Sequence, residues 1–197
     1  MARNLNPRFK ESRRLGVNIY GHPKAMDRYR KGMGRGDKKL STYGEQLLQK
    51  QRLKAYYGVL EKQMRRYMDQ AKKSDDITGD ALVRQLETRL DNMVYRMGFA
   101  SSIRQARQMV VHRHILLNGK RVDRPSHQVS IGDQVTLREK SREIERFKEN
   151  LQELKAHASY ISRDVESFTA TLTKSPEREE IPVEVNDQLV VEYYTSL

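Results

Sequence analysis

The sequence contains no cysteine and no long run of apolar residues. Without cysteine the chain can form neither a disulfide nor a thiolate metal site. No apolar stretch approaches the ~20 residues that a membrane-spanning helix needs. The N-terminus also lacks the apolar segment that a secretory signal carries. We therefore expect a soluble protein of a reducing compartment, the cytoplasm.

Acidic residues are scarce at the beginning of the chain and abundant at its end. The whole chain has 38 Lys+Arg against 26 Asp+Glu, a formal charge of +12. Residues 1–73 carry +14 of this charge, whereas residues 141–197 carry −5. A basic excess of this kind favours a nucleic acid as partner. The acidic end is expected to face a basic protein surface instead.

Residues 88–111 predict two short helices. The first has one apolar edge at helical spacing and ends at Gly98, which tolerates a left-handed cap. Ser102 followed by Gln105 has the form of a capping box and starts the second helix. The apolar positions of the two helices are Leu90, Val94 and Met97, then Ile103, Ala106, Met109 and Val110. Each helix therefore buries one side and presents the other.

Residues 115–138 predict a small antiparallel sheet. Asn118-Gly119 between two apolar runs indicates a two-residue hairpin, because its turn needs positive φ at both central positions. Gly132-Asp133 then turns into residues 134–138, where Val135 and Leu137 alternate with polar residues as in a half-buried strand. Residues 88–140 therefore form a small α-plus-β module.

This module resembles the S-four RNA-binding domain, and stretches on both sides of it extend the likeness. Together they resemble the bacterial-type S-four family of small-subunit ribosomal proteins, in the form without zinc-binding cysteines. The stretches that carry the likeness are residues 40–51 (LSTYGEQLLQKQ), 57–63 (YGVLEKQ), 89–98 (RLDNMVYRMG) and 176–178 (PER). The Gly-Gln-His-Gly segment that relatives often have near residues 20–39 is absent here.

The resemblance implies direct binding to 16S-type ribosomal RNA (rRNA) at a multi-helix junction, early in assembly of the small subunit, and a contribution to translational accuracy. It implies two further partners, the S-five protein of the same subunit and messenger RNA (mRNA) near the channel where it enters the ribosome. It implies no cofactor, no metal, no membrane and no small-molecule substrate. The expected location is the ribosome in the cytoplasm.

The predicted fold class is α+β, with a mainly helical N-terminal lobe, a small C-terminal β element and an inserted S-four-like module of two helices and a small antiparallel sheet. Residues 1–40 have few large apolar side chains, so they are either a disordered basic tail or an arm that becomes ordered on RNA. The resemblance favours the arm. The expected divisions are 1–40 basic RNA-binding arm, 41–87 helical domain, 88–150 S-four-like domain and 151–197 C-terminal segment packing back on the helical domain.

The candidate RNA-binding residues are basic, aromatic or polar side chains of the arm, the helical domain and the module. They are Arg3, Arg13, Arg14, Tyr43, Lys50, Arg52, Lys54, Tyr57, Arg65, Arg89, Arg104, Arg107, Gln108, His112, Asn118, Gly119 and Lys120. The candidate protein-contact residues are Glu179, Glu180 and Glu192. Three short β-leaning runs, residues 168–172, 182–185 and 189–194, are expected to cover the helical region.

Enzymes and other RNA-binding proteins are the alternatives. Residues 89–91 (RLD) match a short element that carries the catalytic aspartate of many pseudouridine synthases, which often bear a similar module. In those enzymes a separate catalytic domain follows the module, whereas only 57 residues follow Lys140 here. Asp91 is therefore interpreted as a capping or helix-dipole carboxylate. A stress-related RNA-binding protein would not explain residues 40–70. The five histidines have no metal-ligand spacing beyond the adjacent His112 and His114, which are interpreted as an RNA contact or surface positions. We predict no catalytic residue.

Overall fold

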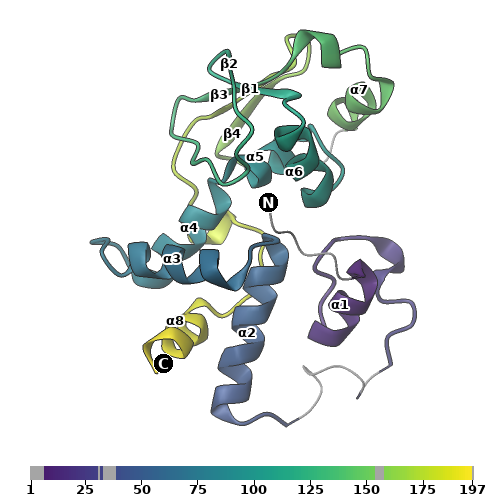
Figure 1. The fold of residues 1–197 in the computed structure, drawn as a ribbon. Coiled ribbons are helices and arrows are strands. Elements are labelled where there is room, and N and C mark those ends of the chain that lie inside the picture. Colours follow the sequence, from purple (N-terminus) through teal and green to yellow (C-terminus); the bar gives the residue numbers. More distant parts are fainter. Residues whose placement is uncertain (1–6, 31, 33–38, 154–157, 197) are drawn as a thin grey trace. The chain divides into compact units, whose positions relative to one another are not determined.

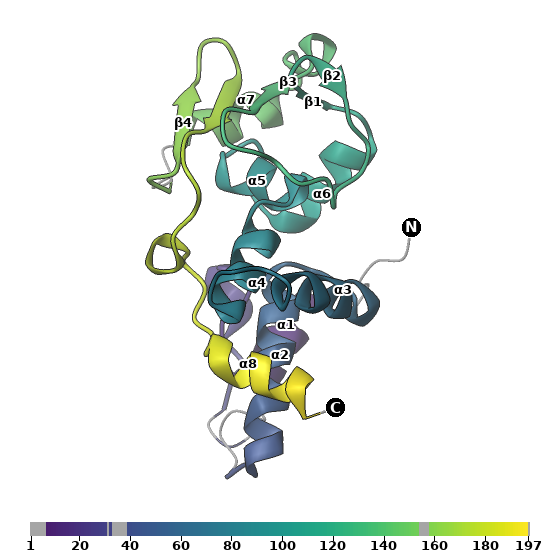
Figure 2. The same cartoon turned by 90° about the vertical axis from the view of Figure 1, so that its left-hand side faces the viewer.

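The computed structural model describes residues 7–30, 32, 39–153 and 158–196 (Figures 1 and 2). The chain divides into two compact units. The helical unit contains Met1–Val83 and Val183–Leu197, and the module unit contains Arg84–Pro182. The module unit is therefore one continuous insertion, whereas the helical unit is assembled from two separate stretches of chain.

Helices and one 3-10 turn make up the described part of the helical unit. They are α1 (Arg8–Leu15), η1 (Pro23–Ala25), α2 (Thr42–Tyr56), α3 (Glu61–Ala71), the first part of α4 (Thr78–Glu87) and α8 (Asp187–Thr195). Helix α8 packs on α2, and both views show the two side by side (Figures 1 and 2). A small core of Leu15, Ile19, Leu48 and Ala55 joins the region of α1 to α2.

Local signals explain the bounds of α2. Ser41 accepts a hydrogen bond from the Gly44 N–H at 3.3 Å, which caps the N-terminus of the helix. The chain turns after Tyr57 at Gly58, whose φ of +59° is a left-handed value that glycine adopts without strain. Helix α2 therefore ends here, and α3 begins three residues later.

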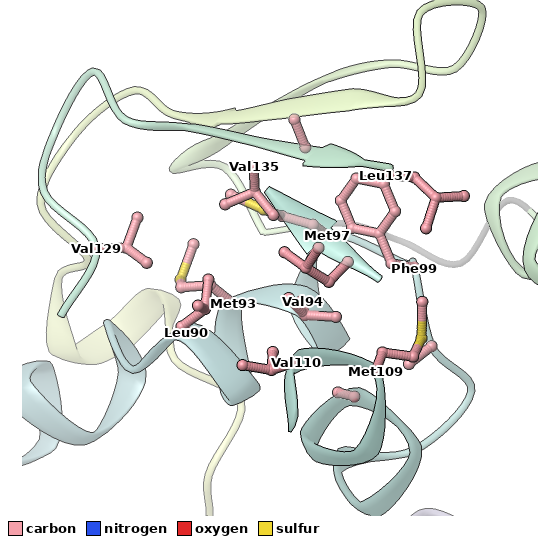
Figure 3. Packing of buried hydrophobic residues seen from close by; sticks show 14 of the residues in the cluster. Leu90, Met93, Val94, Met97, Phe99, Met109, Val110, Val129, Val135 and Leu137 are labelled. Carbon is pink, nitrogen blue, oxygen red and sulfur yellow. The ribbon is translucent and has the colours of Figure 1, made fainter. Parts of the chain in front are cut away.

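The core of the module unit lies between helices and a sheet (Figure 3). Helices α5 (Leu90–Arg96) and α6 (Ile103–Val111) pack against each other. Their buried side chains meet those of the strands in one core, which includes Leu90, Met93, Val94, Met109 and Val110. Gly98 follows α5 with φ of +85°, and a Cβ there would lie 3.1 Å from the Arg163 guanidinium. Both the conformation and the close neighbour therefore require glycine.

The sheet has five antiparallel strands in the order β2-β1-β3-β5-β4. The strands are β1 (Ile115–Leu117), β2 (Lys120–Arg121), β3 (Gln134–Leu137), β4 (Ile161–Asp164) and β5 (Thr169–Leu172). Asn118 and Gly119 have φ of +49° and +75°, which confirms the predicted hairpin turn. The pairing of Ile115 with Leu137 and of Leu117 with Val135 places four apolar side chains on one face. That face covers the core.

Between β3 and β4 lie the 3-10 turn η3 (Glu139–Ser141) and helix α7 (Glu145–Gln152). Helix α7 is amphipathic, since Phe147 and Leu151 join the core of the module unit. After β5 the 3-10 turn η4 (Arg178–Glu180) is the last element of this unit.

The C-terminal segment differs from the prediction in three ways. Residues 169–172 form β5 and pair with β3, so they extend the sheet of the module instead of covering the helical region. Residues 182–185 form no strand. Residues 187–195 form helix α8, although Val190, Val191, Tyr193 and Tyr194 favour strands, because packing on α2 outweighs that preference. Asn186, which accepts a hydrogen bond from the Leu189 N–H at 3.2 Å, is the N-cap signal that could have predicted this helix.

Candidate RNA-binding surface

One face of α6 is open. Gln108 and His112 are exposed and Arg104 is half-buried, and the three residues follow one another at intervals of four along the helix. The opposite side of α6 holds Ile103, Ala106, Met109 and Val110 in the core. Ser102 accepts from the Gln105 N–H as predicted, while the Gln105 side chain accepts from the N–H of Ser101 and not of Ser102. The start of α6 is thereby fixed, and so is the direction in which this α6 face points.

Arg107 and Arg89, two candidate RNA-binding residues, are tied to one buried carboxylate. Arg89 donates to both oxygens of Asp91 at 3.0 and 2.8 Å, and Arg107 Nη1 lies 3.2 Å from Asp91 Oδ2. Asp91 also accepts from the Asn92 N–H. The Arg89 side chain is 0 % exposed, so its assignment to the RNA surface is corrected: it holds the start of α5 in place. Asp91 has a structural role too, which agrees with its predicted interpretation.

The tip of the β1–β2 hairpin is exposed at Asn118, Gly119 and Lys120. The Asn118 side chain is also part of the fold. It donates to Asp133 Oδ1 at 2.7 Å and accepts from the Gln134 N–H at 2.8 Å. These bonds fasten the hairpin turn to the turn that precedes β3. Lys120 is therefore presented on a rigid tip.

In the helical unit, Glu61 lies within ion-pair distance of three candidate cations, Lys50, Lys54 and, at 4.0 Å, the exposed Arg65. Lys50 Nζ and Lys54 Nζ each lie 3.1 Å from Glu61 Oε2, and the Tyr194 hydroxyl donates to Oε1 at 2.8 Å. We call Lys50, Lys54, Glu61 and Tyr194 the Glu61 cluster. Burial acts to raise the pKa of Glu61, but the hydrogen bonds from Tyr194, Lys50 and Lys54 outweigh it and lower that pKa.

Lys50 is inside the protein. Its ammonium lies 4.4 Å from the centre of the Tyr193 ring, and the residue is 4 % exposed. Tyr57 is 1 % exposed. The assignment of both residues to the RNA surface is therefore corrected, because neither side chain is presented to a partner. The Tyr and Lys residues of this region gave no periodic signal for burial. Lys50 is covered by Tyr193 of α8, a helix more than 130 residues away in sequence.

The other candidates of the helical unit lie nearer its surface. Tyr43 is exposed and stands 5.6 Å from the Tyr193 ring, and Arg65 is exposed. Arg52 is half-buried and donates to the Leu15 carbonyl at 3.0 Å. This bond helps to join α1 to α2. Arg3 lies outside the described residues.

The region around α1 has a basic hollow, which we call the α1 hollow. It has a volume of about 500 Å³. Its basic lining residues are Arg8, Lys10, Arg13, Lys24 and Arg28. Arg13 donates to the Ala25 carbonyl, and Arg14 is exposed beside it in sequence. The sequence predicted that residues 1–40 would lack a core, yet Leu15 and Ile19 are buried, so part of the arm is folded. The spacing of the basic residues in the sequence did not predict this hollow.

The three acidic candidates are used within the protein to different degrees. Glu180 accepts from the Ser159 hydroxyl and pairs with Lys174, and these bonds lower its pKa to about 2. Glu192 accepts from the Gln46 side chain at 3.1 Å. Glu179 is exposed. Only Glu179 thus offers its carboxylate to another molecule without giving up a bond in the described part of the chain.

Neither a metal site nor a membrane span is found in the residues that the structure describes. They contain no group of three His, Asp or Glu side chains that could hold a metal ion. None of their helices is long and apolar enough to cross a membrane. What the described surface presents is positive charge on α6, on the hairpin tip and around the α1 hollow.

Comparison with known proteins identifies the family of both parts of the chain. Residues 88–135 match the S4 domain, and residues 3–87 match the ribosomal protein S4/S9 N-terminal domain. Small ribosomal subunit protein uS4 of Finegoldia magna is 59 % identical, with 99 % of this chain and 100 % of the relative covered. Small ribosomal subunit protein uS4B of Clostridium acetobutylicum is 52 % identical, with 99 % of each covered. The chain belongs to the uS4 family of small ribosomal subunit proteins.

Proposed function

We propose that this protein binds 16S-type rRNA directly, as a structural component of the small ribosomal subunit. As a member of a ribosomal protein family it is not an enzyme. One observation carries the proposal: basic residues line the α1 hollow and Lys120 is exposed at the hairpin tip, while Arg89 and Lys50 are neutralised inside. A surface that keeps its positive charge suits a polyanion.

The geometry favours recognition of RNA shape and backbone. The deep groove of A-form RNA excludes side chains, so a protein reads the helix through phosphates and 2′-hydroxyls. Arg104, Gln108 and His112 supply donors along one side of α6, and Lys120 supplies one at the hairpin tip. Two such rigid surfaces contact RNA at fixed places. The protein thereby holds RNA helices in one arrangement, on which further proteins assemble.

The remaining partners follow from the family and from the acidic surface. We propose a contact with the S-five protein of the same subunit and a position near the channel through which mRNA enters, with an effect on translational accuracy. Glu179 is the residue best suited to meet a basic neighbour, because it is exposed and lies in the acidic end of the chain. The same end, by its charge, faces away from RNA.

The direct test is footprinting of small-subunit RNA by the purified protein, with affinity measured over a series of salt concentrations. We expect protection of a compact set of helices in the 5′ part of the RNA. The logarithm of the binding constant should fall linearly with that of salt, with a slope of ~0.7–0.9 for each phosphate neutralised. Scattered protection, or affinity that does not respond to salt, contradicts the proposal.

A further inference from the structure

The cations of the α1 hollow surround a space. The hollow measures about 500 Å³, which is within the ~300–1,000 Å³ of ordinary ligand pockets. Within the described part of the chain, none of its five cations has a carboxylate within ion-pair distance. Cations that converge without neutralisation repel one another. An anion that entered the hollow would relieve this repulsion.

The lining includes an aromatic ring as well as cations. Phe9 is half-buried, and its ring centre lies 4.9 Å from that of His22. The guanidinium of Arg8 lies 5.8 Å from the centre of the same ring. His22 is held in orientation, since its Nδ1 accepts from the Lys24 N–H at 3.1 Å and its carbonyl accepts from Asn18. A simple phosphate needs no aromatic ring, whereas an unstacked nucleobase stacks on one.

Asp27 is the third element of the lining. It is exposed at the hollow and makes no ion pair with the surrounding cations in the described structure. A carboxylate weakens a pure phosphate site by repulsion. It suits a ligand that also carries hydrogen-bond donors. Guanine is the base whose pairing edge has two adjacent donors, N1–H and N2–H, and a carboxylate accepts both in parallel.

We propose that the α1 hollow receives one unstacked guanosine nucleotide of RNA. The base stacks on Phe9 and donates to Asp27, while Arg8, Lys10, Arg13, Lys24 and Arg28 hold the flanking phosphates. This inference rests on the proposed function, because it specifies which part of an RNA the arm recognises. The same chemistry is present in a free guanosine nucleotide, so the experiment separates the two sources.

The test compares RNA hairpins that differ only in one bulged nucleotide, G, A, C or U, with a hairpin that has none. Affinity is measured with the full-length protein by fluorescence anisotropy. We expect the hairpin with bulged G to bind about tenfold more tightly than the unbulged one, as one stacked base allows. Phe9→Leu should abolish this advantage, and Phe9→Tyr should keep it. Asp27→Asn should remove the preference for G over A, and the unbulged hairpin should bind somewhat more tightly because a charge that repels phosphate is gone.

A second pair of variants, Arg28→Gln and Arg30→Gln, tests whether the positive charge of the hollow contributes to binding. Arg28→Gln should weaken binding of every hairpin, because Arg28 lines the hollow, and Arg30→Gln should have a smaller effect, because it is exposed but does not. Thermal unfolding of each variant checks that the fold is retained, and Phe9→Tyr keeps the stacking test valid even where Phe9→Leu is less stable.

The outcomes separate the inference from the function on which it rests. If the 5′ small-subunit RNA fails to bind at all, the proposed function is overturned. If that RNA binds but all bulged hairpins bind alike, only the guanosine site is overturned. If GTP binds the hollow and competes while a bulged G gives no advantage, the hollow takes a free nucleotide and the RNA version is wrong.

Discussion

The Glu61 cluster and the α1 hollow lie in the same helical unit and contain the same kinds of side chain, yet their charges are handled in opposite ways. In the cluster, Glu61 lies 3.1 Å from two ammonium groups, and Tyr193 covers Lys50. In the hollow, five cations line an open space, and no carboxylate within the described structure pairs with them. The first arrangement is complete within the protein, and the second is completed by a partner.

We infer that a basic residue paired with a buried carboxylate serves stability, whereas an unpaired one is available for binding. Arg89 and Arg107 in the module unit obey the same rule, since both reach Asp91. Their neighbour on α6, Gln108, is exposed. Mutations of paired cations or of their carboxylates should therefore change the free energy of unfolding, while mutations of open donors should change RNA affinity.

The largest effect is expected at Asp91. Asp91→Asn should lower the free energy of unfolding by roughly 3–5 kcal/mol, because it leaves Arg89 buried without its carboxylate. Urea unfolding monitored by circular dichroism measures this. Glu179→Gln, which removes an exposed carboxylate of the same unit, serves as the control and should change little. Equal stability of the two variants would mean that Arg89 finds its stabilising partners elsewhere.

A smaller loss is expected at the centre of the Glu61 cluster. Glu61→Gln should destabilise the protein by roughly 1–3 kcal/mol, because it leaves Lys50 buried beneath Tyr193 with a weaker acceptor. The same unfolding assay applies. Glu45→Gln removes an exposed carboxylate from α2 and is the matched control. RNA affinity should be unchanged in both variants, and a large loss of affinity with intact stability would place the cluster on the RNA surface.

The free energy of unfolding should depend on pH through the protonation of Glu61. The pKa of Glu61 is lowered below its ordinary 4.5 in the folded protein. The unfolded chain therefore binds a proton before the folded protein does, so this stabilisation is present above pH 4.5 and is lost as pH falls through the folded value. Unfolding at a series of pH values should show a steeper decline below 4.5 for the wild type than for Glu61→Gln. Parallel declines would assign the acid sensitivity to other carboxylates.

The smallest change in stability, with a clear change in binding, is expected on the α6 face. Arg104→Ala with Gln108→Ala should weaken RNA binding about fivefold, since two polar contacts of ordinary strength are removed. The melting temperature should stay nearly constant, because the core side of α6 is untouched. Arg146→Ala, on the exposed side of α7, is the control cation. A loss of stability without loss of RNA affinity would show that the α6 face is not a binding surface.

The sequence was a good guide wherever a local rule decides the structure. Positive φ at Asn118 and Gly119 follows from two residues, and the cap at Ser102 follows from one hydroxyl and one N–H. The core positions of α5 and α6 follow from helical periodicity. The stretches quoted for the family likeness lie in the two regions that match family models, apart from residues 176–178.

The sequence was a poor guide wherever a distant segment decides. The sequence predicted an exposed Lys50, but Tyr193 of α8 covers it. It also predicted that Arg89 binds RNA, but Arg89 is buried and pairs with Asp91. Strand-favouring residues of α8 gave the wrong element because packing on α2 decides its structure. The α1 hollow could not be predicted from the sequence, because it forms only where the fold of residues 7–28 brings basic residues of two short elements together.

The insertion of the module unit also sets an order for making the protein. Translation proceeds from the N-terminus, so residues 84–182 are complete before α8 is synthesised. The module unit can form its core from one continuous stretch of chain. Lys50 on α2, in contrast, stays uncovered until Tyr193 and Tyr194 have been synthesised. A nascent chain therefore carries a finished RNA-binding module beside an unfinished helical unit. Helix α8, which is made late, therefore completes the packing of α2 and α3, which are made early.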